Sequence, residues 1–285
     1  MNFNEVFQTI ERGICDVYDS KRYRQYLRVM SRFPSYSLNN TILIFSQKPD
    51  ATLVAGYQAW RTKFHRNVRR GEKGIRILAP VSTRRKTDTE EEEPVKPATC
   101  FRAVSVFDIS QTEGEPLPVY MEETLEGSVD DYEDFLEVLE MCAPVPVRFA
   151  SISGNARGYF NARRQEIVLR KGMTQLQTIK TLVHEIAHSM MHQGDDADLS
   201  RRQKEIEAES VAYILCSHYG LDTGSYSFGY LAGYSSSRDM PELRASMERI
   251  HTASSVLISK IDLMRMPEKD PLMEFRIMRD DSLYA

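Results

Sequence analysis

The pentapeptide His184-Glu185-Ile186-Ala187-His188 is the feature that most constrains this chain. Histidines four residues apart project from the same side of an α-helix, with their Cβ atoms roughly 5–6 Å apart. Two imidazoles at that spacing can bind one metal ion. Zinc takes about four ligands, and a catalytic site keeps one of those positions open for water. The spacing has this meaning only if the segment is helical.

The surrounding sequence predicts such a helix. Thr174 and Gln177 have the spacing of a capping box, which opens a helix. Apolar residues then recur at helical spacing, namely Leu176, Ile179, Leu182, Val183, Ile186 and Met190. The motif therefore lies in a half-buried helix. The alternative interpretation is a helix with two solvated or core histidines and no metal.

Glu185 stands beside the first histidine, as in the HExxH motif of zinc metallopeptidases. The metal lowers the pKa of a water molecule to about 7. A neighbouring carboxylate can take the proton and later return it to the leaving amine. We therefore predict that His184 and His188 bind Zn²⁺ and that Glu185 is the base of an endopeptidase acting on a protein or peptide.

A third ligand is needed, and His192 is the first candidate. It lies eight residues from His184, which is about 12 Å along a helix axis. At that separation His184 and His192 cannot both bind the same ion. The longer metzincin motif is also absent, because Met191 and Gly194 occupy the positions of its glycine and third histidine.

A second helix downstream offers better candidates. Ser200 and Gln203 have capping-box spacing, and the helix should run to about Tyr219. Glu205 and Glu209 share one face of it with small residues, which would let two helices approach closely around an ion.

This pattern resembles the ExxxD helix of gluzincin peptidases, with Glu209 in the place of the aspartate. By that resemblance Glu205 is the third ligand, and Glu209 accepts a hydrogen bond that orients a ligand histidine. Glu207 and Glu209 remain alternative ligands. A solvated acidic face is the interpretation without metal.

Gly158–Phe160 and Glu166–Leu169 read as two strands of a β-hairpin, joined by the polar turn Asn161–Gln165. In zincins a strand beside the metal helix pairs with the extended substrate. We expect Ile167–Leu169 to be that edge strand, with an ordinary core strand as the alternative.

The net charge of −4 is divided unevenly along the chain. Residues 1–86 hold 17 Lys and Arg against 6 Asp and Glu, whereas the remaining residues hold 20 against 35. We therefore expect an α+β protein of two domains, residues 1–126 and 127–285. The four cysteines are scattered, no apolar run approaches 18 residues, and the first residues do not form a signal peptide. These features predict a cytoplasmic protein without a membrane segment.

The basic half should contain helices over residues 3–33 and 38–47, and strands over residues 75–78 and 101–108 that pair with each other. The charged segment 82–99 between those strands is expected to be a flexible loop. The densest basic stretch spans residues 60–74 and interleaves cations with aromatic residues. Cations neutralise phosphates, and aromatic rings stack on unpaired bases. The alternative to base stacking is that Trp60 and Phe64 are core residues of the domain.

Several stretches resemble the N-terminal domain of ArdC-type antirestriction proteins, namely residues 36–40 (YSLNN), 49–57 (PDATLVAGY), 70–80 (RGEKGIRILAP) and 106–112 (VFDISQT). Residues 184–188 and 205–209 resemble the zincin-like domain of the same family and the ImmA/IrrE peptidases. The resemblance implies a single-stranded-DNA-binding domain joined to a gluzincin-type metallopeptidase domain. Such proteins travel on mobile elements and protect incoming DNA from restriction. The segment 82–99 departs from the family pattern.

With this resemblance, we expect the following residues to contact single-stranded DNA: Tyr36, Asn39, Trp60, Lys63, Arg66, Arg69, Arg70, Lys73 and Arg76. Two other functions are compatible with the sequence. One is a non-catalytic DNA-coating protein with a structural metal site. The other is a regulatory protease that cleaves a repressor.

Overall fold

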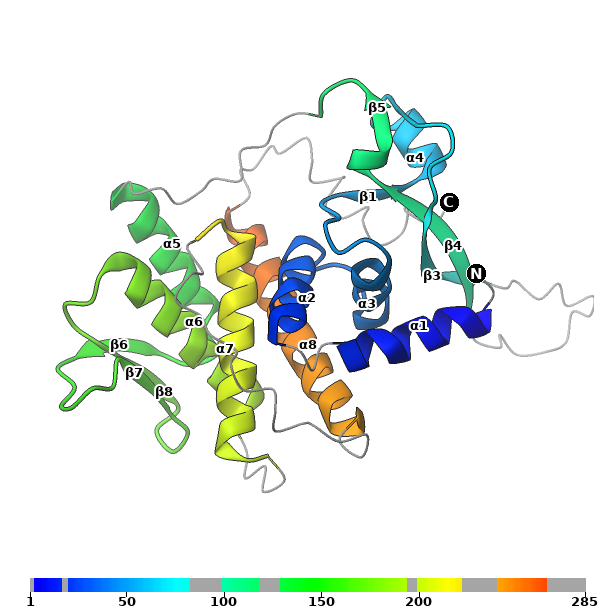
Figure 1. Cartoon of the computed structure of the whole chain (residues 1–285). Helices are drawn as coiled ribbons and strands as arrows, with labels where there is room; N and C mark the ends of the chain where they lie inside the picture. Colours follow the sequence, from blue (N-terminus) through cyan, green and yellow to red (C-terminus); the bar gives the residue numbers. More distant parts are fainter. Residues whose placement is uncertain are drawn as a thin grey trace, which may run out of the picture.

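The computed structural model describes residues 3–16, 20–82, 99–117, 129–193, 199–221 and 240–265. The first part of the chain is an α+β unit (Figure 1). Its elements are α1 (Phe3–Asp16), α2 (Ser20–Arg32), α3 (Leu38–Gln47), β1 (Val54–Gly56), α4 (Tyr57–Thr62), β2 (Arg66–Val68), β3 (Ile75–Ser82), β4 (Thr99–Asp108), the 3-10 turn η1 (Ile109–Gln111) and β5 (Thr112–Gly114).

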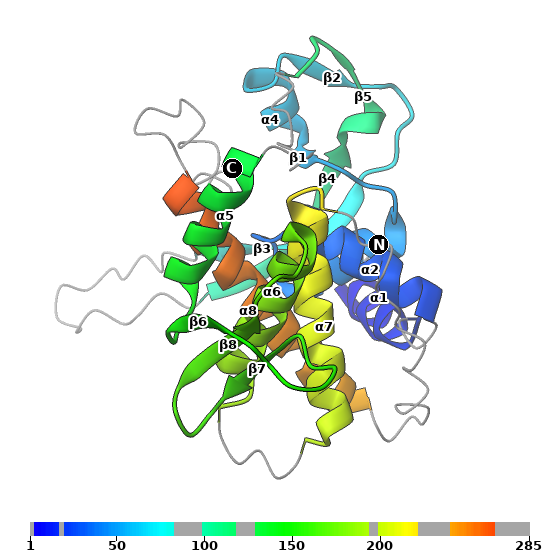
Figure 2. The same ribbon diagram turned by 90° about the vertical axis from the view of Figure 1, so that its left-hand side faces the viewer.

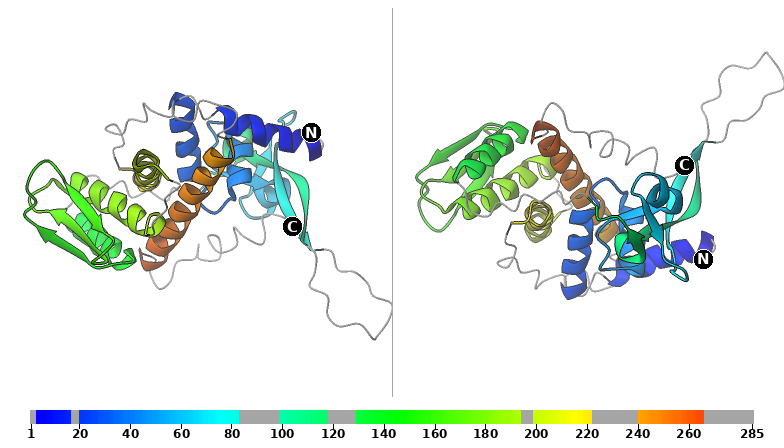
Figure 3. Two further views of the ribbon diagram at one scale, coloured as in Figure 1. Left: turned by 90° about the horizontal axis from the view of Figure 1, so that it is seen from below. Right: turned by 90° about the horizontal axis from the view of Figure 1, so that it is seen from above.

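The second part places a small sheet against helices. Its elements are α5 (Val129–Cys142), β6 (Val147–Ala150), β7 (Gly158–Asn161), β8 (Glu166–Arg170), α6 (Gln175–Met191), α7 (Arg201–His218) and α8 (Met240–Arg265). Seen from below and above, the sheet β6–β8, then α5 and α6, then α7 and α8, then α1–α3 follow one another toward the sheet β1-β4-β3 (Figure 3).

The N-terminal sheet has the order β1-β4-β3, and both pairs are antiparallel. The open edge of β3 is covered by two side-chain amides of α3. Asn40 exchanges two hydrogen bonds with the backbone of Leu78, and Gln47 does the same with the backbone of Arg76. The amides satisfy backbone groups that an edge strand otherwise leaves open to pairing with another chain. Asn40, the second asparagine of the YSLNN stretch, thus has a structural role.

Asp108 fastens β1 to the turn after β4. Its buried carboxylate accepts hydrogen bonds from the backbone N–H groups of Thr52, Leu53 and Ser110. Gln111 completes a capping box with Asp108 and also donates to the Lys73 carbonyl. The polar side chains of the VFDISQT stretch therefore stabilise a turn.

The C-terminal sheet has the order β6-β8-β7, in which β8 pairs parallel with β6 and antiparallel with β7. The expected hairpin is therefore confirmed. The expectation that Ile167–Leu169 is an edge strand is wrong, because β8 has a hydrogen-bonded neighbour on each side. Within the described residues, β7 is the edge of this sheet that packs on α6.

Helix α7 lies between the two parts of the chain, packed against α6, α2 and α8 (Figure 2). The Tyr23 hydroxyl of α2 lies 2.8 Å from the Ser210 hydroxyl of α7, in a buried contact. Residues packed on three sides leave α7 with little solvent-facing surface, and its residues 210–216 are all buried. The two parts of the chain therefore share one continuous core.

Helix α8 makes three hydrogen bonds to the first turn of α3 and to the segment that precedes it. Arg244 donates to the Asn39 side chain at 2.8 Å. The His251 Nε2 lies 2.6 Å from the Tyr36 carbonyl, and the Ser255 hydroxyl donates to the Pro34 carbonyl at 2.7 Å. A helix from the end of the chain thus closes over the beginning.

Several local expectations are confirmed. Within the expected helical stretch 3–33, α1 spans Phe3–Asp16 and α2 spans Ser20–Arg32, and α3 spans Leu38–Gln47 as expected. Thr174 caps α6, although the Gln177 side chain bonds Thr181 instead of completing the box. Ser200 and Gln203 form the expected capping box of α7.

Residues 83–98 of the expected loop and residues 118–128 around the expected domain boundary lie outside the described residues. The division into 1–126 and 127–285 stays a prediction. No helix in the described part of the chain combines the length and the apolar character needed to cross a lipid bilayer.

We expect the free energy of unfolding of the protein to depend on pH through His251. Burial lowers the pKa of His251 more than its bond to the Tyr36 carbonyl raises it. The unfolded chain therefore binds the proton first as pH falls below about 6.5, and stability declines with falling pH. His251→Gln keeps an N–H donor that does not titrate.

We expect the free energy of unfolding of His251→Gln to fall less than that of the wild type between pH 7.5 and 5.5, measured by urea denaturation. Equal declines in the two proteins would contradict this role.

Candidate metal centre

The centre is built where α6 meets α7. Helices α6 and α7 pack against each other, and Ala187 on α6 and Ala208 and Ala212 on α7 are fully buried. That small residues permit a close approach of the two helices stays a prediction. The longer polar side chains on the adjacent faces then reach across the contact.

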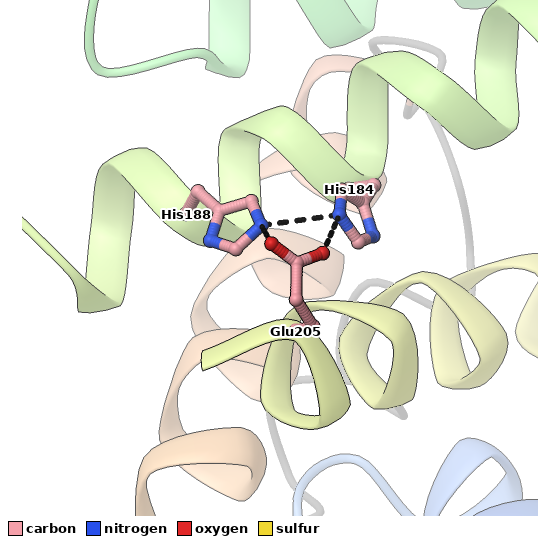
Figure 4. A group of neighbouring side chains, drawn as sticks. All are labelled: His184, His188 and Glu205. Atoms are coloured by element: carbon pink, nitrogen blue, oxygen red, sulfur yellow. Dashed lines mark hydrogen bonds and ion pairs between the residues drawn. The ribbon is translucent and has the colours of Figure 1, made fainter. Parts of the chain in front are cut away.

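Three of those side chains converge. His184 and His188 extend from α6, and Glu205 extends between them from the first turns of α7 (Figure 4). The two Nε2 atoms lie 3.1 Å apart. The Glu205 carboxylate lies 3.4 Å from His184 Nε2 and 3.8 Å from His188 Nε2. One ligand atom from each residue lies within 4.8 Å of the others, and the three could hold a metal ion.

These separations fit a tetrahedral ion. With metal–nitrogen bonds of about 2.0–2.1 Å, adjacent ligand atoms of a tetrahedron lie about 3.3 Å apart. The His184–His188 and His184–Glu205 separations are close to that edge length. Two imidazoles and one carboxylate also leave one tetrahedral position for solvent, which is the donor set of open catalytic zinc sites.

The electrostatics of the centre favour positive charge. Burial opposes protonation of His184, but Glu205, Glu209 and Glu185 outweigh it and raise the pKa of His184 to about 9. Hydrogen bonds from His184 and His188 hold the pKa of Glu205 well below its usual range. The carboxylates around His184 would stabilise a bound divalent cation in the same way.

Glu209 lies on the far side of the first histidine. Its carboxylate is 3.3 Å from His184 Nδ1, the ring nitrogen that does not face His188. A carboxylate in this position orients a ligand imidazole and increases its basicity. The geometry fits the role expected of Glu209 better than that of a ligand.

Glu185 points toward the small sheet. Its side chain is buried, and burial raises its pKa more than His184 and His188 lower it. The backbone N–H of Phe160 in β7 acts in the opposite direction to burial and lowers the pKa of Glu185. A carboxylate with a raised pKa beside the two histidines is suited to take and return a proton near neutral pH.

Glu207, an alternative ligand from sequence, does not face the centre. It is fully buried, lies 3.0 Å from His192 Nε2, and accepts two hydrogen bonds from Arg249. His192 was excluded as a ligand from its spacing, and it lies outside the converging trio. Its Nδ1 nevertheless lies 3.0 Å from His188 Nδ1. The sequence signal for this contact was the four-residue spacing between the two histidines.

Two of the residues expected to contact DNA are buried. Trp60 is 0 % exposed, donates from Nε1 to the Phe107 carbonyl and packs on Phe64. Tyr36 is 5 % exposed and packs edge-on against Phe33. Neither ring can stack on a base in this arrangement, and the core alternative holds for Trp60. These two expectations are corrected.

Four more of the expected residues make internal bonds. Arg66 holds β5 through Thr112, Arg69 pairs with Glu72, and Arg76 bonds Ser105 and the Ala103 carbonyl across β4. Asn39 accepts from Arg244 of α8. The half-buried side chains of Arg66, Arg76 and Asn39 thus contribute to the fold, and their bonds limit how freely they reach a phosphate.

The remaining three expected residues are exposed. Lys63 ends α4, and Arg70 and Lys73 lie in the turn between β2 and β3. Tyr57, at the start of α4, is 53 % exposed, so its ring is accessible to a base.

Comparison with protein families finds two matches. Residues 3–107 match the N-terminal domain of anti-restriction factor ArdC, and residues 141–220 match the IrrE N-terminal-like domain.

Two solved structures of the antirestriction ArdC protein from the R388 plasmid are similar to this chain. The metal-free structure has 18% sequence identity and a TM-score of 0.52, with 87% of this chain and 98% of that chain covered. The Mn(II)-bound structure has 17% identity and a TM-score of 0.54, with 93% and 97% covered. At this identity the likeness establishes the fold alone.

A curated relative is an uncharacterized protein of Bacillus anthracis named pXO2-81. It is 25% identical over 302 residues, which cover 90% of this chain and 51% of the relative. The chain thus spans about half the length of that relative.

The geometry predicts different effects for two glutamates of α7. Glu205→Gln should weaken Zn²⁺ binding more than Glu209→Gln does, because it removes a carboxylate from the converging trio. Glu209→Gln should weaken it about 10–100-fold, as expected for a group that orients a ligand. Competition with a chromophoric chelator measures both. A larger loss in Glu209→Gln would reverse the two roles.

Proposed function

We propose the following function for this chain, which matches two family domains and has the fold of ArdC. The chain is a zinc-dependent endopeptidase joined to a single-stranded-DNA-binding domain, and it protects the DNA of a mobile element from restriction. The observation that carries the enzymatic part is the convergence of His184, His188 and Glu205 beside the buried carboxylate of Glu185.

His184, His188 and Glu205 would hold the ion, which supplies Lewis-acid polarisation of a water molecule and of the scissile carbonyl when bound. Glu185 removes a proton from the attacking water and transfers it to the leaving amine. Its raised pKa favours the first transfer, because the carboxylate gains a proton more readily than an exposed glutamate. Glu209 holds the ring of His184 from the other side.

An extended peptide is the substrate that the neighbouring sheet favours. The Arg170 N–H donates to the Arg157 carbonyl, one register position beyond the first paired residues of β7 and β8. Because antiparallel pairing alternates, the backbone groups of Gly158 and Phe160 face away from β8. A peptide added along this edge would pass Glu185, whose pKa is lowered by the Phe160 N–H of the same strand.

Single-stranded DNA is the ligand that the N-terminal part favours. Lys63, Arg70 and Lys73 are exposed there, with Tyr57 exposed nearby in sequence. Residues 1–86 carry 17 Lys and Arg against 6 Asp and Glu, a charge that phosphates would neutralise. The match to the ArdC N-terminal domain supports the same role. Tethering to DNA would raise the effective concentration of the peptidase near DNA-bound proteins.

A non-catalytic function has one observation in its favour. The exposed cations lie on the N-terminal part and need no metal centre to bind phosphates. A protein that only coats DNA would therefore protect it without Glu185.

Replacing Glu185 by glutamine tests the enzymatic part. Glu185→Gln should leave Zn²⁺ binding intact, because Glu185 is not one of the converging trio, and lower peptide cleavage by about 10²–10⁴-fold, the usual contribution of general acid–base catalysis. Cleavage of a fluorogenic peptide library measures the rate. Glu133→Gln, the same change at an exposed position of α5, serves as the control.

Wild-type cleavage that persists in Glu185→Gln would contradict the assignment of the base. If Glu185→Gln protects DNA from a restriction enzyme as well as the wild type does, the coating function is correct.

The DNA-binding part predicts a steep salt dependence. Removal of three phosphate contacts in the triple variant Lys63→Ala, Arg70→Ala and Lys73→Ala should reduce the slope of log affinity against log salt by about 2 for single strands. Fluorescence anisotropy with a labelled single-stranded oligonucleotide measures the slope.

The matched control removes three exposed cations near the small sheet, Arg163, Arg164 and Lys171. It changes the net charge by the same amount. Equal slopes for the two triple variants would show that binding follows total charge and would contradict a DNA site in the N-terminal part.

A further inference from the structure

His192 is a buried histidine that the proposed mechanism does not use. It follows α6 directly and bonds through both ring nitrogens. Its Nδ1 lies 3.0 Å from His188 Nδ1, and its Nε2 lies 3.0 Å from Glu207 Oε2. Only 8 % of its surface is exposed. A buried imidazole with both nitrogens engaged has a fixed position and a fixed orientation.

We propose that His192, held by Glu207 and Arg249, is the positioning residue that orients His188 toward the metal. This inference rests on the metal centre proposed above and adds a role for residues outside it. A metal-binding histidine generally donates its second ring N–H to a carboxylate, a carbonyl or water, which fixes the ring and increases its basicity. For His188 the acceptor is another histidine.

The ring nitrogens allow one consistent arrangement of protons. His188 Nε2 faces His184 and Glu205, so a metal ion there requires Nε2 to be unprotonated and places the proton of the neutral ring on Nδ1. His192 must then accept at Nδ1 and carry its proton on Nε2. That proton points to the Glu207 carboxylate at 3.0 Å. Each N–H donor in the series His188, His192 and Glu207 therefore meets an acceptor.

Glu207 is a suitable end to this chain because its own position is fixed. It is 0 % exposed, and burying a carboxylate is unfavourable unless it is paired. Arg249 of α8 supplies two hydrogen bonds to the Glu207 carboxylate. A carboxylate held by α8 thus anchors His192, which in turn anchors a histidine of α6.

The two histidines of the motif are then oriented in parallel ways. Glu209 lies directly beside His184 Nδ1 at 3.3 Å. Glu207 does not contact His188, and His192 fills the intervening distance. Both imidazoles are therefore linked to carboxylates of α7, one directly and one through an intermediate ring.

A role limited to packing predicts otherwise. In that case His192 and Glu207 would only join α6 to α7 and α8, and their loss would lower stability without a specific effect on metal affinity. The proton positions on the two rings would also be unconstrained by the metal. Affinity and proton position thus separate the two roles.

The first test compares Zn²⁺ affinities of full-length variants by chelator competition. His192→Leu fills the space without an acceptor, and it should weaken binding about 10–100-fold, as expected for loss of an outer contact to a ligand. His192→Asn places an amide oxygen near the former Nδ1 and should recover part of that loss. His218→Leu is the control, because His218 is a half-buried histidine of α7 that bonds the Ser31 carbonyl. Its removal should not change the affinity.

The second test needs no variant. In zinc-loaded protein with ¹⁵N-labelled histidine, NMR should find the proton of His188 on Nδ1 and that of His192 on Nε2. A proton on His192 Nδ1 would overturn the proposal, because that nitrogen could no longer accept. This measurement decides the question even if His192→Leu fails to fold.

The outcomes separate this proposal from the proposed enzyme. Normal zinc affinity in folded His192→Leu would overturn the positioning role and leave the enzyme intact. Zinc-loaded wild type that cleaves no peptide would overturn the enzyme and leave the affinity comparison valid. Absence of zinc binding in the wild type would overturn both proposals, and the wild-type titration alone reveals it.

Discussion

Helices α6 and α7 pack against each other, and the candidate metal centre is assembled beside that contact. Ala187, Ala208 and Ala212 of the two helices are fully buried. His184 and His188 come from one helix, and Glu205 comes from the other. Neither helix alone presents three ligand groups to one point. Packing of apolar surface thus determines the geometry of the polar centre.

Helix α8 connects this contact to the beginning of the chain. On one side its Arg249 holds the buried Glu207 of α7, and on another its His251 and Ser255 bond carbonyls of residues 34–36. The shared core means that the N-terminal part is not an independent attachment. For the proposed function such a junction matters, because it defines the position of the metal centre relative to the N-terminal part.

Local patterns and the pairing of β3 with β4 were predicted correctly from the sequence, whereas several other contacts between distant segments were not. The cap residues Thr174 and Ser200 marked the starts of α6 and α7, since capping depends on neighbours in sequence. The position of β8 between two strands depends on pairing with β6, and the burial of Trp60 depends on a carbonyl 47 residues away. The role of His192 likewise required α7 and α8. Glu205 was found through a family resemblance rather than through periodicity.

The central claim is that one divalent ion binds between α6 and α7. A crystal structure of the zinc-loaded protein, with anomalous data collected at the zinc edge, tests this most directly. We expect one strong peak about 2.0–2.2 Å from His184 Nε2, His188 Nε2 and a Glu205 oxygen. A peak bound to other side chains, or no peak between the two helices at saturating zinc, would contradict it.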